Sequence, residues 1–339
     1  MYMIKELIRL VKYALTEEEF NENEFAHLTE EDWQEIYETA EAHSITPVLG
    51  VLLERKLQSC KAEAVLKIRD SLFQTVTEYE VMEEELKKIC RVLDQTGIPY
   101  IPLKGVRVRK YYPKPWMRTI RDLDVLIPEK DFARAGQEIE EKLSYRKEEK
   151  SGQDAYFYAP SGVILELHSN LQENIEHMDY VLKRVWDYSS QEEEGGNSTR
   201  YVQSNEFYMF HMIAHMAYHF IRGECSIRAF MDIELLQNHM EMQEEEVQDL
   251  CDNAGIGTFY RQVQKLLGCW FGDREYDEVT KVLEECLMDD QAFREEERKP
   301  ADTVFKKIRT FFEDLLHKEE EEAFLAKEEG LLEKLGLKE

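Results

Sequence analysis

Two short apolar runs in an otherwise helix-like chain constrain the fold most. The first, Ile98–Leu103, ends at Lys104-Gly105, and the second, Asp122–Ile127, opens with two aspartates. Short apolar runs bounded by Gly, Pro or charged residues are typical of buried strands. We therefore expect two strands joined by a turn and a short helix over Val106–Tyr112, which Pro113 stops.

The aspartates of the second run suggest a metal site. Asp122 and Asp124 stand two positions apart, so on a strand both side chains leave the same face, roughly 6.5–7 Å from each other. Mg²⁺ in proteins prefers a few carboxylates together with phosphate oxygens. Paired metal ions can stabilise the attacking and leaving oxygens of an in-line displacement. The spacing therefore predicts one or two divalent ions at this strand.

A third carboxylate is expected to complete this site. Glu166 lies inside the apolar run Val163–Leu167, which we expect to form a hairpin with Ala155–Ala159. An unpaired charge is costly to bury, so Glu166 needs a partner. His168 alternates onto the same strand face and is predicted to support the metal ligands from outside.

A phosphate-binding turn is predicted at Lys104-Gly105. Gly105 would let the backbone approach a ligand closely, and a helix N-terminus offers N–H groups to a phosphate. Lys104 would add a charge-assisted contact, although an ordinary turn lysine is the alternative. Arg118 and Arg121 are further candidates, and Arg118 could instead pair with Asp122 or Asp124. Residues 98–121 hold no acid, and their cations are Lys104, Arg107, Arg109, Lys110, Lys114, Arg118 and Arg121.

The flanking regions read as helical. A long helix is expected from about Ala62 to Thr96, ending at Gly97, and the polar segment Ser189–Arg200 as a loop or linker. We divide the chain into a helical region at 1–96, a core at 97–188 and a helical domain at 189–339. The predicted fold class is α+β, a small mixed sheet with helices on one face, mostly α overall.

Three histidines share one face of a predicted helix over Glu206–Ile221. His211, His215 and His219 recur every four residues, which is also a spacing that metal ligands use on helices. We favour a histidine face packed against the core. On the next helix Arg228 and Asp232 are expected to form an ion pair. The acidic runs Glu244–Glu246 and Glu319–Glu322 read as solvated helix faces.

The overall charge limits the partners. Among the 339 residues, 43 Lys and Arg face 71 Asp and Glu, a net charge of −28, which argues against an extensive nucleic-acid surface. No apolar run approaches the roughly 20 residues that span a bilayer. The N-terminus lacks the pattern of a signal peptide. The cysteines are scattered and form no Cys-x-x-Cys pair, which indicates reduced thiols. Together these observations predict a soluble, cytoplasmic protein without a membrane partner.

The order of these motifs resembles the nucleotidyltransferase superfamily of the DNA polymerase β type. Within it, the chain is similar to a bacterial branch of uncharacterised nucleotidyltransferases and to the abortive-infection toxin nucleotidyltransferases, which have a comparable Leu-Lys-Gly turn. The resemblance extends from about Asp32 to Leu236. Its motifs are Leu103-Lys104-Gly105, Tyr112-Pro113, Arg118, Asp122-Leu123-Asp124 and Glu166-Leu167-His168.

The resemblance implies roles for these residues. Asp122 and Asp124 would bind the metals, and Glu166 would help to bind a metal and activate the acceptor hydroxyl. Lys104 and Gly105 would hold phosphate.

Two departures stand at the turn and at the third acid. Lys104 replaces the first Gly of the broader pattern and Val106 offers no hydroxyl, while Glu166 replaces the commoner Asp. Counterparts of His215, Arg228 and Asp232 also occur in that branch.

The predicted function follows from the resemblance. With Mg²⁺ (or Mn²⁺), the protein would transfer a nucleoside monophosphate from an NTP, such as ATP, to an unknown acceptor hydroxyl and release pyrophosphate. The acceptor could be a protein, a small molecule or RNA. The net negative charge argues against an extensive contact surface for RNA. The alternative is a catalytically degenerate nucleotide-binding or protein-interaction module on the same core, whose acidic helices would bind a protein partner.

Overall fold

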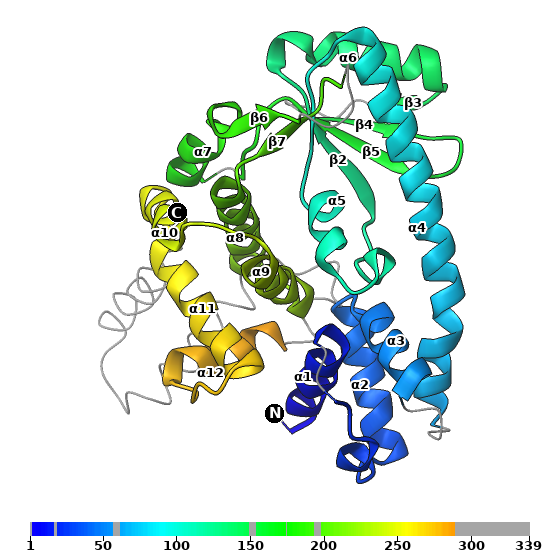
Figure 1. Ribbon diagram of the computed structural model, residues 1–339, viewed down its shortest axis with the longest axis vertical. Helices are drawn as coiled ribbons and strands as arrows, with labels where there is room; N and C mark the ends of the chain where they lie inside the picture. Colours follow the sequence, from blue (N-terminus) through cyan, green and yellow to red (C-terminus); the bar gives the residue numbers. More distant parts are fainter. Residues whose placement is uncertain are drawn as a thin grey trace, which may run out of the picture.

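A small mixed sheet stands at one end of a mostly helical molecule (Figure 1). The computed structural model describes residues 2–16, 19–56, 62–148, 154–173, 175–192 and 198–288. The predicted α+β class, mostly helical, is confirmed. The acidic run Glu319–Glu322 lies outside the described residues, whereas Glu244–Glu246 starts a helix.

The N-terminal helices follow the sequence signals closely. Thr29 and Asp32 form a capping box at the start of α2, because each side chain accepts from the other residue's backbone N–H. The longest helix ends at Gly97, whose φ of +69° is a conformation that glycine adopts without steric cost. The elements are α1 (Tyr2–Leu15), η1 (Glu22–Phe25), α2 (Glu30–Ala42), α3 (Thr46–Lys56) and α4 (Glu63–Thr96).

The five-stranded sheet has the order β1-β2-β5-β4-β3, with β2 and β5 parallel and the other neighbours antiparallel. The predicted hairpin is present as β4 and β5. The strand expected over Ile98–Leu103 is shorter than predicted, because only two of its residues pair with β2. The strands are β1 (Ile101–Pro102), β2 (Asp122–Leu126), β3 (Arg146–Glu148), β4 (Asp154–Tyr158) and β5 (Ile164–His168).

One face of this sheet is apolar and covered by helices. Leu123 and Val125 of β2 join Leu165 and Leu167 of β5 in a core with α4 and α6 (Glu129–Leu143). Side chains alternate between the two faces of a strand. The residues between these apolar positions, Asp124 and Glu166 among them, therefore lie on the opposite face.

Short elements connect β1 with β2 and the sheet with the C-terminal helices. The predicted loop Ser189–Arg200 is partly a strand, because Ser189–Gln191 pairs with Tyr201–Gln203 in a two-stranded sheet; residues 193–197 lie outside the described part. The short elements are α5 (Gly105–Val108), η2 (Arg109–Tyr111), η3 (Pro115–Met117), α7 (Glu176–Leu182), η4 (Val185–Tyr188), β6 (Ser189–Gln191) and β7 (Tyr201–Gln203).

A second core joins the two ends of the described chain. Buried residues of α1 to α3 and of the first turns of α4 pack in one cluster with those of the C-terminal helices. These helices are α8 (Asn205–Ile221), α9 (Ile227–His239), α10 (Glu244–Asn253), α11 (Gly257–Phe271) and α12 (Glu278–Leu287). Within the described ranges, none of the helices is long and apolar enough to cross a bilayer. The division at 96 and 188 stays a prediction.

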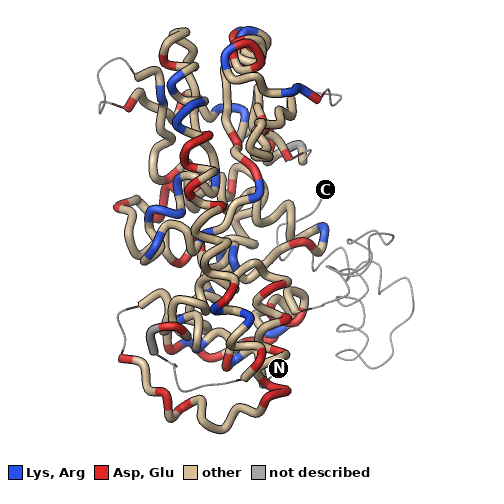
Figure 2. The backbone as a smooth tube through the Cα atoms, turned by 90° about the vertical axis from the view of Figure 1, so that its right-hand side faces the viewer, with Lys and Arg blue, Asp and Glu red and all other residues tan. Residues whose placement is uncertain are grey.

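Basic residues are scattered among acidic ones along the backbone (Figure 2). Several cations of residues 98–121 are engaged inside the molecule. Arg107 donates to the carbonyl of Gln203 at 2.7 Å, and Arg109 pairs with Glu83. These arginines therefore brace the fold around the turn.

Candidate active site

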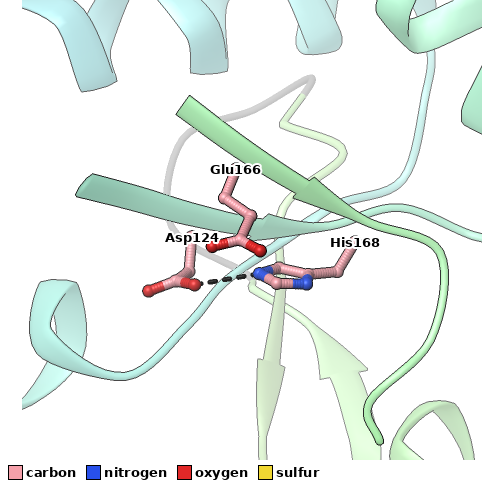
Figure 3. Close-up of side chains that lie close together, drawn as sticks. All are labelled: Asp124, Glu166 and His168. Carbon is pink, nitrogen blue, oxygen red and sulfur yellow. Dashed lines mark hydrogen bonds and ion pairs between the residues drawn. The ribbon is translucent and has the colours of Figure 1, made fainter. Parts of the chain in front are cut away.

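Three side chains from β2 and β5 form the centre of the polar sheet face. Asp124 and Glu166 stand side by side in the parallel register, and His168 follows on the same face of β5 (Figure 3). One ligand atom from each lies within 4.8 Å of the others. Among the described residues this is the one group of three or more His, Cys, Asp or Glu side chains arranged in this way. Its two carboxylates suit a hard divalent cation.

Asp124 is the hub of this group. Its Oδ1 accepts from Nζ of Lys104 at 3.2 Å and lies 2.9 Å from Nε2 of His168, whose Nδ1 lies 3.0 Å from Oδ1 of Asp154. Burial opposes ionisation of Asp124, but Lys104 and His168 hold its pKa well below the usual range. Burial also acts against a charged His168, yet its two carboxylate partners raise its pKa to about 9. Asp124 therefore lies between two cationic side chains.

Asp122 and Glu166 add negative charge beside this hub. Burial raises the pKa of Asp122, and the neighbouring carboxylate of Asp124 raises it further. Glu166 accepts a hydrogen bond of 2.6 Å from the Tyr156 hydroxyl. A divalent cation would offset the repulsion between these carboxylates, so the residues present fit a metal ion.

The turn before α5 holds Lys104 in an unusual backbone conformation. Its φ of +45° and ψ of −117° are rare for a residue with a side chain. The Tyr208 hydroxyl donates to the Lys104 carbonyl at 2.7 Å, and Leu103 N donates to the Asp124 carbonyl at 3.0 Å. A Cβ at Gly105 would overlap the side chain of Ile120, so a glycine is required at this position for steric reasons.

The two predicted arginines lie in different surroundings. Arg118 forms a buried double contact with Asp232 of α9, with Nε–Oδ1 and Nη2–Oδ2 both at 2.8 Å. Asp232 thus pairs with Arg118 from another element, and Arg228, its expected partner, donates to the Thr119 carbonyl at 3.3 Å. Arg121 is exposed, directly before β2.

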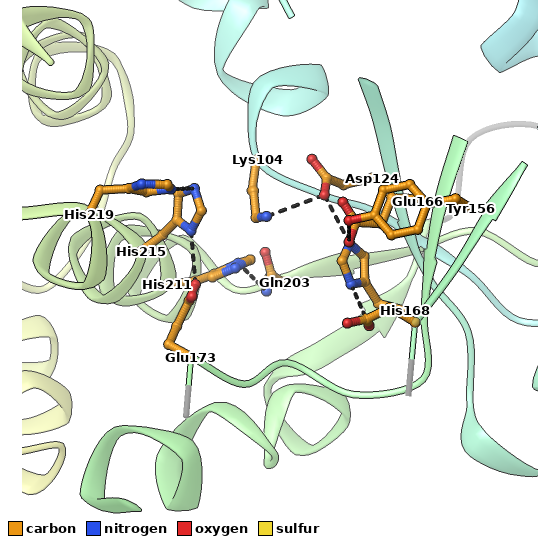
Figure 4. A network of polar contacts seen from close by, with 11 residues as sticks. Lys104, Asp124, Tyr156, Glu166, His168, Glu173, Gln203, His211, His215 and His219 are labelled. Carbon is orange, nitrogen blue, oxygen red and sulfur yellow. Dashed lines mark hydrogen bonds and ion pairs between the residues drawn. The ribbon is translucent and has the colours of Figure 1, made fainter. Parts of the chain in front are cut away.

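A cavity of about 200 Å³ opens beside the acidic group. Lys104, Glu166 and His168 line one side, and Glu173 with His211 lines the other (Figure 4). The remaining lining residues are Leu103, Asp154, Asn170, Leu171, Gln172, Leu182 and Tyr218.

The histidine face of α8 points toward this cavity. His211 Nδ1 lies 3.3 Å from the Gln203 amide, and His215 Nδ1 lies 2.8 Å from Oε1 of Glu173. Burial lowers the pKa of His211 and His215 well below the usual value, so both rings are neutral. His219 contacts His215 at 3.1 Å. The face is therefore both packed and hydrogen-bonded to the cavity wall.

Sequence reasoning missed Glu173, Tyr156 and Asp154. The alternation of β4 places Asp154 and Tyr156 on one face, and this was the available signal for them. Glu173 lies in an irregular segment, 42 positions before its partner His215, and no local spacing relates the two residues.

Comparisons with known proteins assign the chain to a family. No curated protein matches it. One solved structure that resembles it is described as "Solution Structure of Antibiotic-Resistance Factor ANT(2'')-Ia Reveals Substrate-Regulated Conformation Dynamics", with 15% identity, a TM-score of 0.37, and coverage of 53% of this chain and 92% of that one. Residues 29–272, most of the chain, match the family described as Uncharacterised nucleotidyltransferase. The chain therefore belongs to the uncharacterised nucleotidyltransferase family.

Proposed function

We propose that this protein transfers a nucleoside monophosphate from an NTP to an acceptor hydroxyl and releases pyrophosphate, with Mg²⁺ or Mn²⁺ as cofactor. The observation that carries the proposal is the placement of Asp124 beside Glu166 and next to Asp122. Glu166 and Lys104 line a cavity there. The family membership supports nucleotidyl transfer in general.

Asp122, Asp124 and Glu166 would hold the metal. When bound, the ion would neutralise charge on the NTP phosphates and on the oxygens that attack and leave. His168 would fix the orientation of Asp124 through its contact with Asp154 on the far side of the ring. Mg²⁺ and Mn²⁺ prefer oxygen ligands, which the three carboxylates supply.

Lys104 and Gly105 would hold the phosphates. The Lys104 ammonium already reaches the acidic group, so it would lie close to a metal-bound phosphate. Arg121 is exposed and could reach the same ligand without breaking a contact. Arg118 would first have to leave Asp232, and breaking a buried ion pair is costly, so we rank Arg121 ahead of it.

Labelling experiments test the activity. The protein is incubated with Mg²⁺, cell extract and each of the four α-labelled NTPs, and we expect one extract component to become labelled while pyrophosphate is released. The double variant Asp122→Asn/Asp124→Asn should lose at least about 100-fold of the rate, because metal stabilisation contributes several kcal/mol and about 1.4 kcal/mol corresponds to tenfold. Full activity in a folded double variant would reject the site.

A second function rests on the contacts of Asp124. Lys104 and His168 both contact its Oδ1, an arrangement that would also suit a protein that binds nucleotide but does not turn it over. Calorimetry with each NTP and Mg²⁺ separates the two: binding without pyrophosphate release would favour the binding module, which could recruit a protein partner.

The net charge of the protein limits the class of nucleotidyl acceptor, and its cysteines indicate its cellular location. We propose a protein or small-molecule acceptor, since a net charge of −28 disfavours a large RNA footprint. The described cysteines Cys90, Cys225, Cys251 and Cys269 are free thiols, which supports a cytoplasmic location.

A further inference from the structure

A chain of four hydrogen-bonded side chains leads away from the cavity. Glu173 contacts His215 Nδ1 at 2.8 Å, the two Nε2 atoms of His215 and His219 lie 3.1 Å apart, and His219 Nδ1 contacts Glu224 at 3.2 Å. The side chains become more exposed in this order, at 12%, 27%, 34% and 35%. The inner part of the chain is visible in Figure 4.

The three contacts of this chain require three protons. A neutral imidazole carries a single N–H, so two neutral histidines supply two. When both carboxylates are ionised and each accepts an Nδ1–H, the Nε2 atoms of His215 and His219 face each other with lone pairs at 3.1 Å. One additional proton removes this repulsion.

The additional proton can sit at either end of the chain. With Glu173 protonated, every donor points outward through His215 and His219 to Glu224. With Glu224 protonated, every donor points inward to Glu173. Both states satisfy all three contacts, and they differ only in which end carries the proton. The chain therefore has the bonding pattern of a proton wire.

A metal ion between the two histidines fits less well. In the described part of the molecule the ligand cluster with three members is the one around Asp124, and the histidine pair lacks a third ligand of this kind. Burial, and after it the ammonium of Lys104, lower the pKa of His215.

We propose that Glu173 is the general base of the reaction, and that His215, His219 and Glu224 conduct the proton to solvent. This rests on the proposed nucleotidyl transfer. Glu173 takes the proton of the acceptor hydroxyl, the oxygen bonds to the α-phosphorus, and the bond to pyrophosphate breaks. The proton leaves at Glu224, whose carboxylate accepts from Nε of Arg222 at 3.3 Å.

The surroundings of Glu173 suit this role. Burial raises its pKa to about 7, which Lys104, His219 and His168 oppose and Asp124 supports. A base titrating near neutral pH is efficient in proton transfer. The backbone N–H of Glu173 donates to Asp179 at 2.6 Å, which fixes its segment. Glu166, by contrast, is engaged by Tyr156 and would be occupied by a metal.

Activity measurements form one arm of the test, with the labelled NTP and cell extract as probe. Glu173→Gln should lower the rate by about 100-fold or more, since general bases contribute 10²–10⁴-fold, while calorimetry shows unchanged Mg²⁺–NTP binding. His219→Ala should slow the reaction less, move its pH profile, and recover with added imidazole. His239→Gln, a histidine bonded to its own helix at Leu235, is the control. A normal rate and pH profile in Glu173→Gln would overturn the proposal.

A second arm needs no acceptor. In the full-length protein with ¹⁵N-labelled histidine, NMR should show a transition near pH 7 in which both rings stay neutral and the ring beside the newly protonated carboxylate exchanges its Nδ1–H for an Nε2–H. Both Glu173→Gln and Glu224→Gln should shift this transition, and His239→Gln should not. Conversion of either ring to an imidazolium in this transition, or unchanged tautomers, would overturn the wire. A coupled transition in a protein that releases no pyrophosphate would reject the proposed function alone and leave the wire standing.

Discussion

Lys104 combines a strained backbone with a charge that the site uses. Its φ of +45° lies in a region that side chains disfavour, and the Tyr208 hydroxyl holds the turn in place. Strain of this kind is retained where the surrounding structure needs the side chain in one position. Here the ammonium is placed against Asp124.

Two substitutions of Lys104 separate strain from charge. Both Lys104→Ala and Lys104→Gly remove the ammonium, but only glycine relaxes the backbone, so the glycine variant should be more stable than the alanine variant by about 1 kcal/mol. Urea denaturation checks the difference. Equal stability would mean that the turn is not strained, and both variants should bind NTP more weakly than the natural protein.

His43 makes the stability depend on pH. It is buried after α2, and its Nδ1 accepts the N–H of Ile227 at 3.2 Å. Burial lowers its pKa from 6.5 to about 4. The unfolded chain therefore binds this proton more tightly, and stability is full above pH 6.5 and falls as the pH drops toward 4.

Protonation of His43 should lower the free energy of unfolding by about 2 kcal/mol between about pH 7.5 and pH 5. His43→Asn keeps an acceptor for Ile227 but cannot titrate, so its unfolding free energy should change less with pH by this amount. Urea denaturation at the two pH values measures both proteins. If the free energies of unfolding of the two proteins changed equally with pH, the folded protein would bind the His43 proton as tightly as the unfolded chain does.

At the scale of elements, a buried ion pair ties the segment before β2 to α9. Arg118 follows η3, Asp232 lies on α9, and the Tyr112 hydroxyl donates to the same carboxylate at 2.7 Å. The side chains of Arg118 and Asp232 are 10% and 1% exposed. Removing one partner would leave the other charge buried and unpaired.

Asp232→Asn should therefore destabilise the protein by about 3–5 kcal/mol. The double variant Arg118→Met/Asp232→Leu should recover much of this loss, because it leaves no unpaired charge. The half-exposed pair Arg261–Asp252 is the control, and Asp252→Asn there should cost at most about 1 kcal/mol. Thermal denaturation compares the variants; a similar cost at both pairs would contradict a structural role for the buried pair.

At the scale of the molecule, two cores share α4. Its first turns, with Ile68, pack with the N- and C-terminal helices, and its later turns, with Ile89, pack against the sheet. Trp33 of α2 and Trp270 of α11 lie in the same core. Helices from both ends of the described chain therefore stabilise each other.

These two tryptophans should report a single unfolding transition. Variants that keep only Trp33 or only Trp270 should give the same urea midpoint. Leu49→Ala truncates a fully buried side chain of α3 and should lower the free energy of unfolding by about 2–5 kcal/mol, so that both midpoints fall together. Fluorescence measures the transitions. Earlier loss of the Trp33 signal would instead support the division of the chain at residue 96.

Sequence alone determined most of the helices and the alternation along the central strands. Alternation is a property of the local backbone, so Asp122 with Asp124, and Glu166 with His168, could each be placed on one face of their own strand from their spacing. The helix end at Gly97 and the mixed α+β class followed from equally local rules. Strand lengths did not, because they depend on pairing partners.

Tertiary structure decided what surrounds that face. The partner of Arg118, the contact of Glu173 with His215 and the cavity between β5 and α8 all join residues far apart in the chain. Such contacts depend on how whole helices pack, and no spacing along the sequence encodes that packing. The acids of the sheet were therefore predictable, whereas the position of His211 across the cavity from them required the fold.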